Sequence, residues 1–401
     1  MRPIKKLIQL DEALAIVLER ATPMKRKETL PLLKAVGRVS GQNVVSRISV
    51  PPFSRAAMDG YAVRARDTFG ASKMKPIVLS KVDTVYAGGV PRKHIAKGTC
   101  AEIATGAMMP KGADSVVMVE DTESNGARVS INESVHPGKN VSMKGEDISP
   151  GVRIVSEGDI LNPSKIGSLA AIGVEDAEVY CRPLVGIVPT GNEIAELGTD
   201  LKPGQVYNIN SYTLASVVRA NGAEARVLPV VNDTLKDIQR AMKKNNDCDM
   251  LVFSGGSSVG ERDIMLDVLE RSGEVLFHGI AVKPGKPTLF GTIGGQLVFG
   301  MPGYPTSCLS NAYILLAPTL RRMARLPENE PPCVRARMSR RVVSATGRTQ
   351  FLTVKLDRGV ALPVFKESGA ITSMAFADGY VIIPADVDLI EKNEEVKVFL
   401  L

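Results

Sequence analysis

The stretch DMLVFSGGSSVGERDIMLDVLER, residues 249–271, carries the pattern that decides the fold. Its first part, 249–254, is a short apolar run typical of a buried strand, and its last part, 264–271, has helical spacing of apolar residues. A polar, glycine-rich loop joins the two. A strand, such a loop and a helix in this order are typical of the α/β class, whose ligands bind at the carboxyl ends of the strands.

The same alternation continues on both sides of this stretch. The predicted elements are strands at 184–188, 225–231, 274–282 and 296–300, and helices at 211–220, 234–245 and 307–323. Thr234 and Asp237 have the spacing of a capping box at the start of one of these helices. Strands that alternate with helices at these lengths predict a doubly wound, parallel α/β sheet.

The segments that flank the α/β region differ from it in pattern. Short β-type runs between Gly, Pro and Asp turns predict a small β domain up to about residue 138. Short alternating runs without a good helix predict a terminal β barrel or sandwich over 328–401. At the other end, apolar residues at helical spacing between Leu7 and Leu18 predict an amphipathic helix rather than a signal peptide.

The composition of the 401 residues narrows the classes of function. A net charge of +7 favours an anionic partner, and the lack of Trp with only 4% aromatic residues argues against nucleic acid. No stretch approaches the roughly 18 apolar residues of a membrane span, so a cytoplasmic protein is predicted. The five cysteines form no CxxC pair and the three histidines have no metal-ligand spacing. Any metal is therefore expected to be a hard cation on carboxylates.

Four polar loops follow predicted strands of the α/β region. They are VPTGNEI (188–194), FSGGSSVGERD (253–263), KPGKPT (283–288) and FGMPGYPTSC (299–308). Each alone is compatible with a structural turn, or for KPGKPT a solvated basic loop, as well as with a ligand site. Four together at one edge favour an anion site, where glycines admit a close backbone approach. Glu193, Asp233 and Asp263 also fall at strand ends, where they could hold Mg²⁺ across phosphates.

Nine motifs in order carry a resemblance to a known family. They are PPFSRAAMDGYAV (51–63), ATGAMMPKGADSVV (104–117), KGED (144–147), PTGNEI (189–194), NINSYTL (208–214), SGGSSVGERD (254–263), KPGKPT (283–288), GMPGYPTS (300–307) and GAITSMAFADGYVIIP (369–384). By these motifs the chain resembles the molybdopterin molybdenumtransferases of the MoeA family, the last enzymes of molybdenum cofactor assembly. The C-terminal E domain of gephyrin is similar to the same family. The resemblance covers essentially the whole chain.

The resemblance implies a subunit of four parts. These are a linker domain made of 1–49 plus 139–180, a small β domain at 50–138, an α/β molybdopterin-binding domain at 181–327, and a C-terminal β-barrel domain at 328–401. It also implies a homodimer, in which Asp59 and Thr105 of one subunit face the α/β site of the other. From the residues alone, Asp59 and Thr105 are equally well explained as turn formers.

The implied reaction inserts molybdate or tungstate into adenylylated molybdopterin, with Mg²⁺-dependent release of AMP. A separate molybdopterin adenylyltransferase would supply the substrate. The resemblance implies catalytic roles for Asp59, Thr105, Asp233 and Asp263, and Mg²⁺ binding by Glu193, Asp233 and Asp263. The implied substrate-binding residues are Thr190, Gly191, Asn210, Ser211, Ser254, Gly255, Gly256, Ser257, Ser258, Pro302 and Gly303. The implied oxyanion-binding residues are Ser258, Lys283, Lys286, Arg348 and Ser373.

Three positions depart from the commoner family pattern, namely Met143, Asn192 and Tyr304. They bear on local details of cation and pterin binding and leave the implied reaction intact. Two other functions stay open from the residues. One is the preceding molybdopterin adenylyltransferase step, which the four-part architecture disfavours because such an enzyme would end near the α/β boundaries. The other is a non-catalytic scaffold of the gephyrin type, which the retained acidic and lysine residues disfavour.

Overall fold

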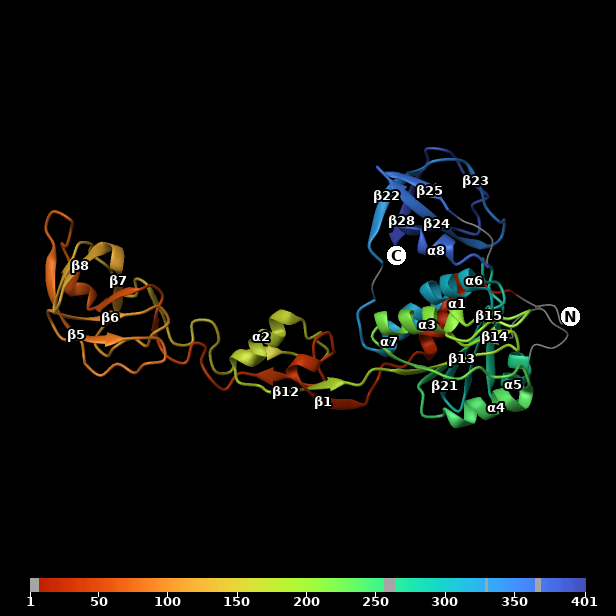
Figure 1. The fold of residues 1–401 in the computed structure, drawn as a ribbon, viewed down its shortest axis with the longest axis horizontal. Coiled ribbons are helices and arrows are strands. Elements are labelled where there is room, and N and C mark those ends of the chain that lie inside the picture. The colour runs from red at the N-terminus through yellow and green to blue at the C-terminus, as the bar shows by residue number, and fades with distance from the viewer. Residues whose placement is uncertain (1–6, 256–263, 329–330, 365–368) are drawn as a thin grey trace. The chain divides into compact units, whose positions relative to one another are not determined.

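The structure is a computed structural model that describes residues 7–255, 264–328, 331–364 and 369–401 (Figure 1). Contacts between residues divide the chain into two compact units. One unit combines the N-terminal segment up to Glu28 with Tyr180–Leu401, and the other is Thr29–Val179.

A six-stranded sheet forms the centre of the first unit. Its strands, in spatial order, are β16 (Glu224–Val227), β13 (Leu184–Pro189), β17 (Met250–Ser254), β21 (Gln296–Met301), β20 (Leu289–Ile293) and β18 (Glu274–His278). The first four are parallel, as predicted. The prediction of a wholly parallel sheet is wrong at one side, because β20 runs antiparallel to both of its neighbours. Gly294 and Gly295, both at positive φ, form a two-residue hairpin that turns the chain straight back into β21.

Helices cover both faces of this sheet, which confirms the doubly wound α/β class (Figure 1). One face packs against α1 (Leu10–Arg20), α3 (Ile209–Ala220) and the helical run Pro305–Met323, which is α6, a π-helical turn and α7. The other face packs against α4 (Leu235–Lys244), capped by Thr234, and α5 (Ile264–Ser272). Within the described residues, none of the helices combines the length and the apolar character that crossing a bilayer requires.

The N-terminal helix α1 belongs to the core of this first unit. Ala13 and Val17 are fully buried in the same cluster as residues of β13 and β17. Ile8, just before the helix, forms a parallel bridge with Ile280. The amphipathic pattern correctly predicted the helix, and these contacts show that it packs on the α/β sheet. The boundaries of the four-part division remain predictions.

The C-terminal strands close into a barrel, as predicted. They are β22 (Cys333–Met338), β24 (Thr349–Asp357), β25 (Val360–Pro363), β26 (Gly379–Ile383) and β28 (Glu395–Leu400), and pairing of β24 with β26 completes the ring. The barrel interior has a hydrophobic cluster of its own, whereas Phe351 and Tyr380 of the barrel belong to the cluster of the α/β sheet. Tyr380 of the barrel stacks on Phe351 at 4.2 Å and on Tyr313 of the π-helical turn at 6.3 Å between ring centroids.

The second unit contains the predicted small β domain. Its six-stranded sheet comprises β7 (Ser115–Met118), β4 (Gly60–Val63), β6 (Thr99–Ile103), β5 (Ile77–Val85), β9 (Arg128–Ile131) and β8 (Thr122–Asn125). The rest of the unit includes α2 (Pro163–Ala171), whose N-cap Asn162 accepts a hydrogen bond from the backbone N–H of Lys165. Separate clusters of buried apolar side chains hold these two parts together internally.

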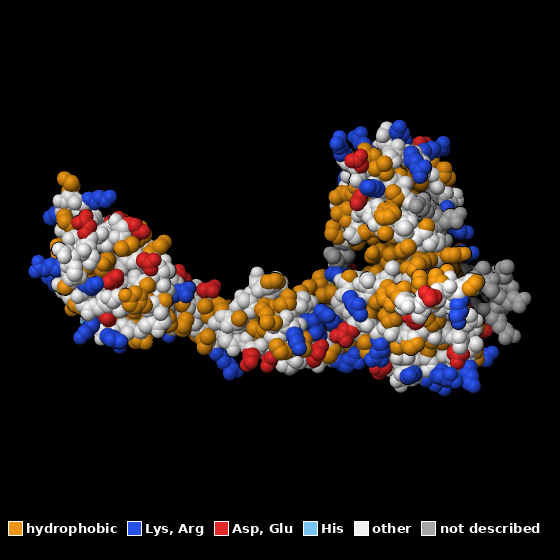
Figure 2. All heavy atoms as spheres, viewed as in Figure 1, with side chains coloured by type: hydrophobic (Ala, Val, Ile, Leu, Met, Phe, Trp, Pro, Cys, Tyr) orange, Lys and Arg blue, Asp and Glu red, His pale blue; other side chains and the backbone are white. Residues whose placement is uncertain are grey.

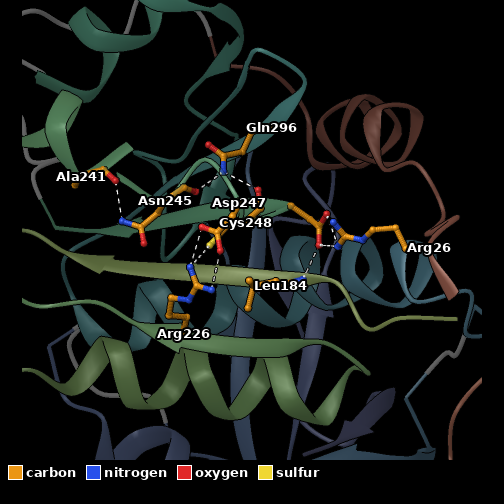
Figure 3. Close-up of polar contacts among 9 residues, drawn as sticks. Arg26, Leu184, Arg226, Ala241, Asn245, Asp247, Cys248 and Gln296 are labelled. Atoms are coloured by element: carbon orange, nitrogen blue, oxygen red, sulfur yellow. Dashed lines mark hydrogen bonds and ion pairs between the residues drawn. The ribbon is translucent and has the colours of Figure 1, made fainter. Parts of the chain in front are cut away.

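Side chains fix the amino ends of the parallel strands in the first unit (Figure 3). Both carboxylate oxygens of Asp249 accept from Arg26, at 3.0 and 2.7 Å, and one of them also accepts from the backbone N–H of Leu184 at 2.8 Å. Gln296 donates to the carbonyls of Asn245 and Cys248. These bonds fix where β13, β17 and β21 begin, and so where they end at the opposite edge of the sheet.

Candidate functional site

Three of the predicted loops meet at the carboxyl edge of the α/β sheet. The backbone N–H of Thr190, after β13, donates to the carbonyl of Ser254 at 2.9 Å. A Cβ on Gly255 would collide with the carbonyl oxygen of Thr190, so only glycine fits at the end of β17. A Cβ placed on Gly303, after β21, would lie 3.6 Å from the Cα of Gly255. The structure therefore brings these predicted substrate-binding residues together.

The start of α3 packs onto the same loops. Asn208 caps the helix by accepting a hydrogen bond from the backbone N–H of Ser211 at 3.2 Å. Two residues later, Asn210 donates its side-chain N–H to the carbonyl of Gly303 at 2.8 Å. Asn208, Asn210 and Ser211 are all buried. The NINSYTL motif thus contributes three polar side chains to the edge where the loops converge.

Several of these side chains have unsatisfied hydrogen-bonding atoms. Among the described residues, the buried atoms without a partner at this edge include Thr190 Oγ1, Asn208 Nδ2, Asn210 Oδ1 and Ser211 Oγ. Leaving one such group unpaired in the interior costs about 1–3 kcal/mol. A fold that keeps four of them, one on the loop after β13 and three at the start of α3, indicates a site for a polar ligand, which would supply the missing donors and acceptors.

Two carboxylates from adjoining loops flank this site. Glu193 follows β13, and its carboxylate oxygens lie 2.7 Å from where a Cβ on Gly191 would be. Asp233 comes two residues after Val231, which forms a parallel bridge with Thr190. No cluster of three or more acidic, His or Cys side chains suited to a metal occurs in the described part of the chain. Two carboxylates with ligand phosphates and water nevertheless fit Mg²⁺, which seldom uses more protein ligands.

The basic loop KPGKPT lies at the same edge of the sheet. It precedes β20, whose first residue Leu289 pairs with Gly300 near the end of β21. Lys283 ends the two-residue strand β19 (Val282–Lys283), which pairs with β24 of the barrel. Lys283 is exposed and Lys286 half-buried, so both ammonium groups are accessible to an anion.

The barrel places the two remaining oxyanion candidates differently. Arg348 is exposed and directly precedes Thr349, whose backbone N–H donates to the carbonyl of Ala281 beside the basic loop. Ser373 is buried, and its hydroxyl donates to the carbonyl of Ala370 at 2.8 Å. The same carbonyl accepts from Thr306 of the GMPGYPTS loop at 3.2 Å. Ser373 therefore shapes the turn that holds this loop, and its contact with an oxyanion remains a prediction.

Asp59 and Thr105 lie together in the second unit. Asp59 directly precedes β4, and Thr105 lies in the turn after β6. One carboxylate oxygen of Asp59 accepts from the backbone N–H of Thr105 at 2.7 Å and from its hydroxyl at 3.0 Å. These bonds lower the pKa of the Asp59 carboxyl, with the backbone bond contributing most. The side chain is thus an exposed carboxylate, held in a fixed direction and charged at neutral pH.

Replacing Thr105 with alanine is expected to raise the pKa of Asp59 while leaving it below its ordinary value of 3.8, because the backbone N–H bond remains. In the wild type these bonds favour the folded state above pH 3.8, and that contribution is lost as the pH falls through the lowered pKa. Carboxyl-detected NMR titration of Asp59 in both proteins measures the shift. An unchanged pKa would mean that the hydroxyl does not donate to Asp59 in solution.

Four predicted site residues lie outside the described residues. They are Gly256, Ser257, Ser258 and Asp263 of the SGGSSVGERD motif, which the described residues Ser254 and Gly255 precede. Their assigned roles remain predictions.

A separate cavity of about 260 Å³ lies between residues 228–232 and α4. Arg240 and Lys244 contribute to its lining, and Figure 2 shows Lys and Arg side chains gathered where α4 lies. The lining residues do not include any of the four residues with unsatisfied buried atoms at the carboxyl edge. The strand-end loops, rather than this cavity, therefore define the candidate site.

Sequence reasoning missed two polar residues beside the predicted ones. Asn208 lies within the quoted NINSYTL motif, and its place before a helical run is a typical N-cap signal that could have identified it. Asn311, in the helix after GMPGYPTS, contacts the basic loop at Gly285. No local pattern marks Asn311, because its role depends on two segments 26 residues apart that pack together.

Comparison with known proteins places the whole chain among related sequences. A model described as MoeA N-terminal region (domain I and II) matches residues 8–173. One described as a probable molybdopterin binding domain matches 186–322, and one described as MoeA C-terminal region (domain IV) matches 335–401. Molybdopterin molybdenumtransferase 2 of Mycobacterium tuberculosis is 33% identical over 384 residues, covering 93% of this chain and 95% of the relative. The Haemophilus influenzae molybdopterin molybdenumtransferase is 32% identical over 348 residues, covering 86% and 85%.

Solved structures show the same similarity in three dimensions. A molybdopterin biosynthesis MoeA protein of Pyrococcus horikoshii superimposes with a TM-score of 0.85 at 41% identity, covering 98% of this chain and 99% of that one. A second such structure from the same organism gives a TM-score of 0.82 at 32% identity, covering 99% and 100%. The similarity therefore extends over all parts of the chain, not over the α/β region alone.

Proposed function

Because the chain belongs to the MoeA family of molybdopterin molybdenumtransferases, we propose that the carboxyl edge of its α/β sheet binds adenylylated molybdopterin and molybdate. The protein is a transferase of molybdenum cofactor biosynthesis and carries out the molybdopterin molybdenumtransferase step. The observation that supports the assigned site is the set of buried, unpaired atoms on Thr190, Asn208, Asn210 and Ser211. The polar edge of a pterin and its phosphates offer the donors and acceptors that these atoms lack.

In this proposal, the charge of each group of site residues determines which part of the substrates it binds. The glycine-bearing loops at Gly255 and Gly303 admit the phosphates close to backbone N–H groups. Glu193 and Asp233 would hold Mg²⁺ beside them. When bound, the cation would neutralise phosphate charge and polarise the bond to the adenylate. Lys283 and Lys286 attract molybdate, a tetrahedral dianion, by charge. The protein positions its substrates electrostatically, and no side chain is proposed as a nucleophile.

The test is a reaction with purified protein, adenylylated molybdopterin, Mg²⁺ and molybdate, in which AMP release is followed against time. We expect AMP release that depends on molybdate and yields mature cofactor. Tungstate should compete with molybdate, because the two anions have the same charge and almost the same size. AMP release that is independent of molybdate would refute the proposed coupling between metal insertion and cleavage of the adenylate.

The homodimer implied by the family leads to a complementation test. We propose that Asp59 of one subunit completes the site at Asp233 of its partner. In a random mixture of Asp59→Ala and Asp233→Ala chains, half of the dimers are mixed, and each mixed dimer contains one intact site. Activity should therefore return to about a quarter of the wild-type value, although each variant alone is inactive.

The matched control for this test is a mixture of Asp59→Ala and Thr105→Ala chains. Both changes lie on the same side of the proposed shared site, so no mixed dimer has an intact site and activity should not return. Well-folded, dimeric Asp59→Ala and Asp233→Ala chains that fail to complement would refute the shared site. Equal recovery in both mixtures would refute it as well.

A further inference from the structure

The basic loop KPGKPT is held in place by one buried side chain of another element. Asn311, the last residue of α6 (Pro305–Asn311), is fully buried. Its Nδ2 donates to the carbonyl of Gly285 at 2.7 Å and to the hydroxyl oxygen of Thr288 at 2.6 Å. The carbonyl of Gly285 can only accept, so the nitrogen of the amide must face the loop. Both N–H groups of Asn311 therefore donate to the basic loop, one to Gly285 between the two lysines and one to Thr288 just before β20.

The loop closes around this amide through further bonds. Thr288, also fully buried, donates its hydroxyl to the carbonyl of Gly285 at 3.0 Å. The carbonyl of Lys286 accepts from the backbone N–H groups of Ile280 and Thr288, both at 3.0 Å. Gly285 has a φ of +107°, and a Cβ there would collide with the Asn311 amide. These bonds therefore hold the backbone of the loop in one conformation around the side chain of Asn311.

We propose that Asn311 is a positioning residue for the oxyanion site, which sets the backbone that carries Lys283 and Lys286. This inference rests on the proposed function in one respect, the assignment of molybdate to the basic loop. The π-helical turn Ala312–Leu316 begins directly after Asn311. Such turns alter the direction in which the neighbouring side chains leave the helix, and they occur often beside functional sites.

The proposal predicts a selective defect. Without the amide, the carbonyl of Gly285 and the hydroxyl of Thr288 each lose a bond, and the loop gains alternative conformations in which the lysines are no longer held for one dianion. A lost hydrogen bond typically corresponds to about fivefold in an equilibrium, and we expect Asn311→Ala to raise the half-saturating molybdate concentration about five- to tenfold. The maximal rate of AMP release and the affinity for adenylylated molybdopterin should change less than twofold.

Ser310→Ala is the matched control. Ser310 is the adjacent residue, is equally buried, and donates only within its own helix, to the carbonyl of Ser307. This variant should lower thermal stability and leave unchanged both the half-saturating molybdate concentration and the affinity for adenylylated molybdopterin. If Asn311→Ala and Ser310→Ala have the same profile, with lower stability and an unchanged half-saturating molybdate concentration, Asn311 has a structural role only and the proposal is wrong.

A second variant approaches the contact from the loop. Gly285→Ala introduces the Cβ that meets the amide, and it should produce the same selective rise in the molybdate requirement. In the double variant Asn311→Ala with Gly285→Ala, the Cβ enters space that the amide has left, so the combined effect should be smaller than the product of the single effects. Fully multiplicative effects would show that the two residues act independently and would overturn the proposal.

Hydrogen exchange separates this inference from the proposed function. In full-length Asn311→Ala, without substrates, the backbone amides of Ile280 and Thr288 should exchange faster, because both donate to the carbonyl of Lys286. Ser310→Ala should leave them unchanged. Faster exchange with an unaltered molybdate requirement would confirm that Asn311 holds the loop but refute the loop as the oxyanion site. Unaltered exchange would refute the positioning role, whatever the activity.

Discussion

Lys286→Ala is expected to raise the molybdate concentration for half-maximal AMP release by at least tenfold. A charge-assisted contact contributes about 1.5–3 kcal/mol, or roughly 10–150-fold in affinity. The backbone at Lys286 is fixed by two hydrogen bonds to its carbonyl, and truncation of the side chain leaves both intact. Affinity for adenylylated molybdopterin should change little, since its phosphates are assigned to the glycine-bearing loops. Initial rates at varied molybdate, with pterin saturating, measure the effect.

Lys236→Ala is the control for this charge change. Lys236 is an exposed lysine in the first turn of α4, outside the loops of the candidate site. Lys236→Ala should leave the half-saturating molybdate concentration unchanged. In Lys286→Ala, inhibition by tungstate should weaken by the same factor as the affinity for molybdate. If Lys286→Ala instead abolished pterin binding at an unchanged molybdate requirement, the basic loop would be a phosphate clamp and the assignment would be wrong.

Asp233→Asn is expected to lose AMP release at low Mg²⁺ while it keeps its fold. The change removes a proposed cation ligand from a half-buried loop position and leaves the volume of the side chain almost unaltered. If weakened cation affinity is the cause, raising Mg²⁺ should restore activity by mass action. Rates over a range of Mg²⁺ concentrations, with direct measurement of Mg²⁺ binding by calorimetry, test this.

Asp386→Asn, an exposed carboxylate of the barrel, is the matched control and should behave as the wild type. Asp263→Asn should resemble Asp233→Asn if the two carboxylates hold one cation. An Asp233→Asn protein that binds Mg²⁺ normally yet stays inactive at every Mg²⁺ concentration would exclude a role as cation ligand and point to direct participation in the reaction.

The local patterns of the chain predicted most of the α/β fold. The strand and the helix of the stretch 249–271 lie where apolar spacing placed them. Thr234 does cap α4. The spacing of apolar residues could not predict two features, the direction of one strand and the location of the first helix. The direction of β20 follows from the hairpin at Gly294 and Gly295, and the location of α1 follows from which apolar face was available to cover the sheet.

The candidate site was predictable in its loops but not in its supporting residues. Glycine and proline spacing identified the segments around Thr190, Gly255 and Gly303, which do converge. The part played by Asn311 was not predictable, because an asparagine inside an apolar helix has no distinctive pattern. Its meaning arises only when tertiary packing buries it against the carbonyl of Gly285. Buried hydrogen-bond partners are set by long-range contacts, which a single sequence does not reveal.

The position of α1 has a consequence for how the protein is made. On the ribosome α1 emerges before Thr29–Val179, although the sheet that buries Ala13 and Val17 is encoded only after that unit. At about 5–20 residues per second, the intervening stretch of about 150 residues delays the partner strands by roughly 8–30 s. The nascent unit at Thr29–Val179 has its own apolar clusters and can acquire structure in this interval. Helix α1 is therefore made early but can pack on the sheet only after the strands from β13 onward have been translated.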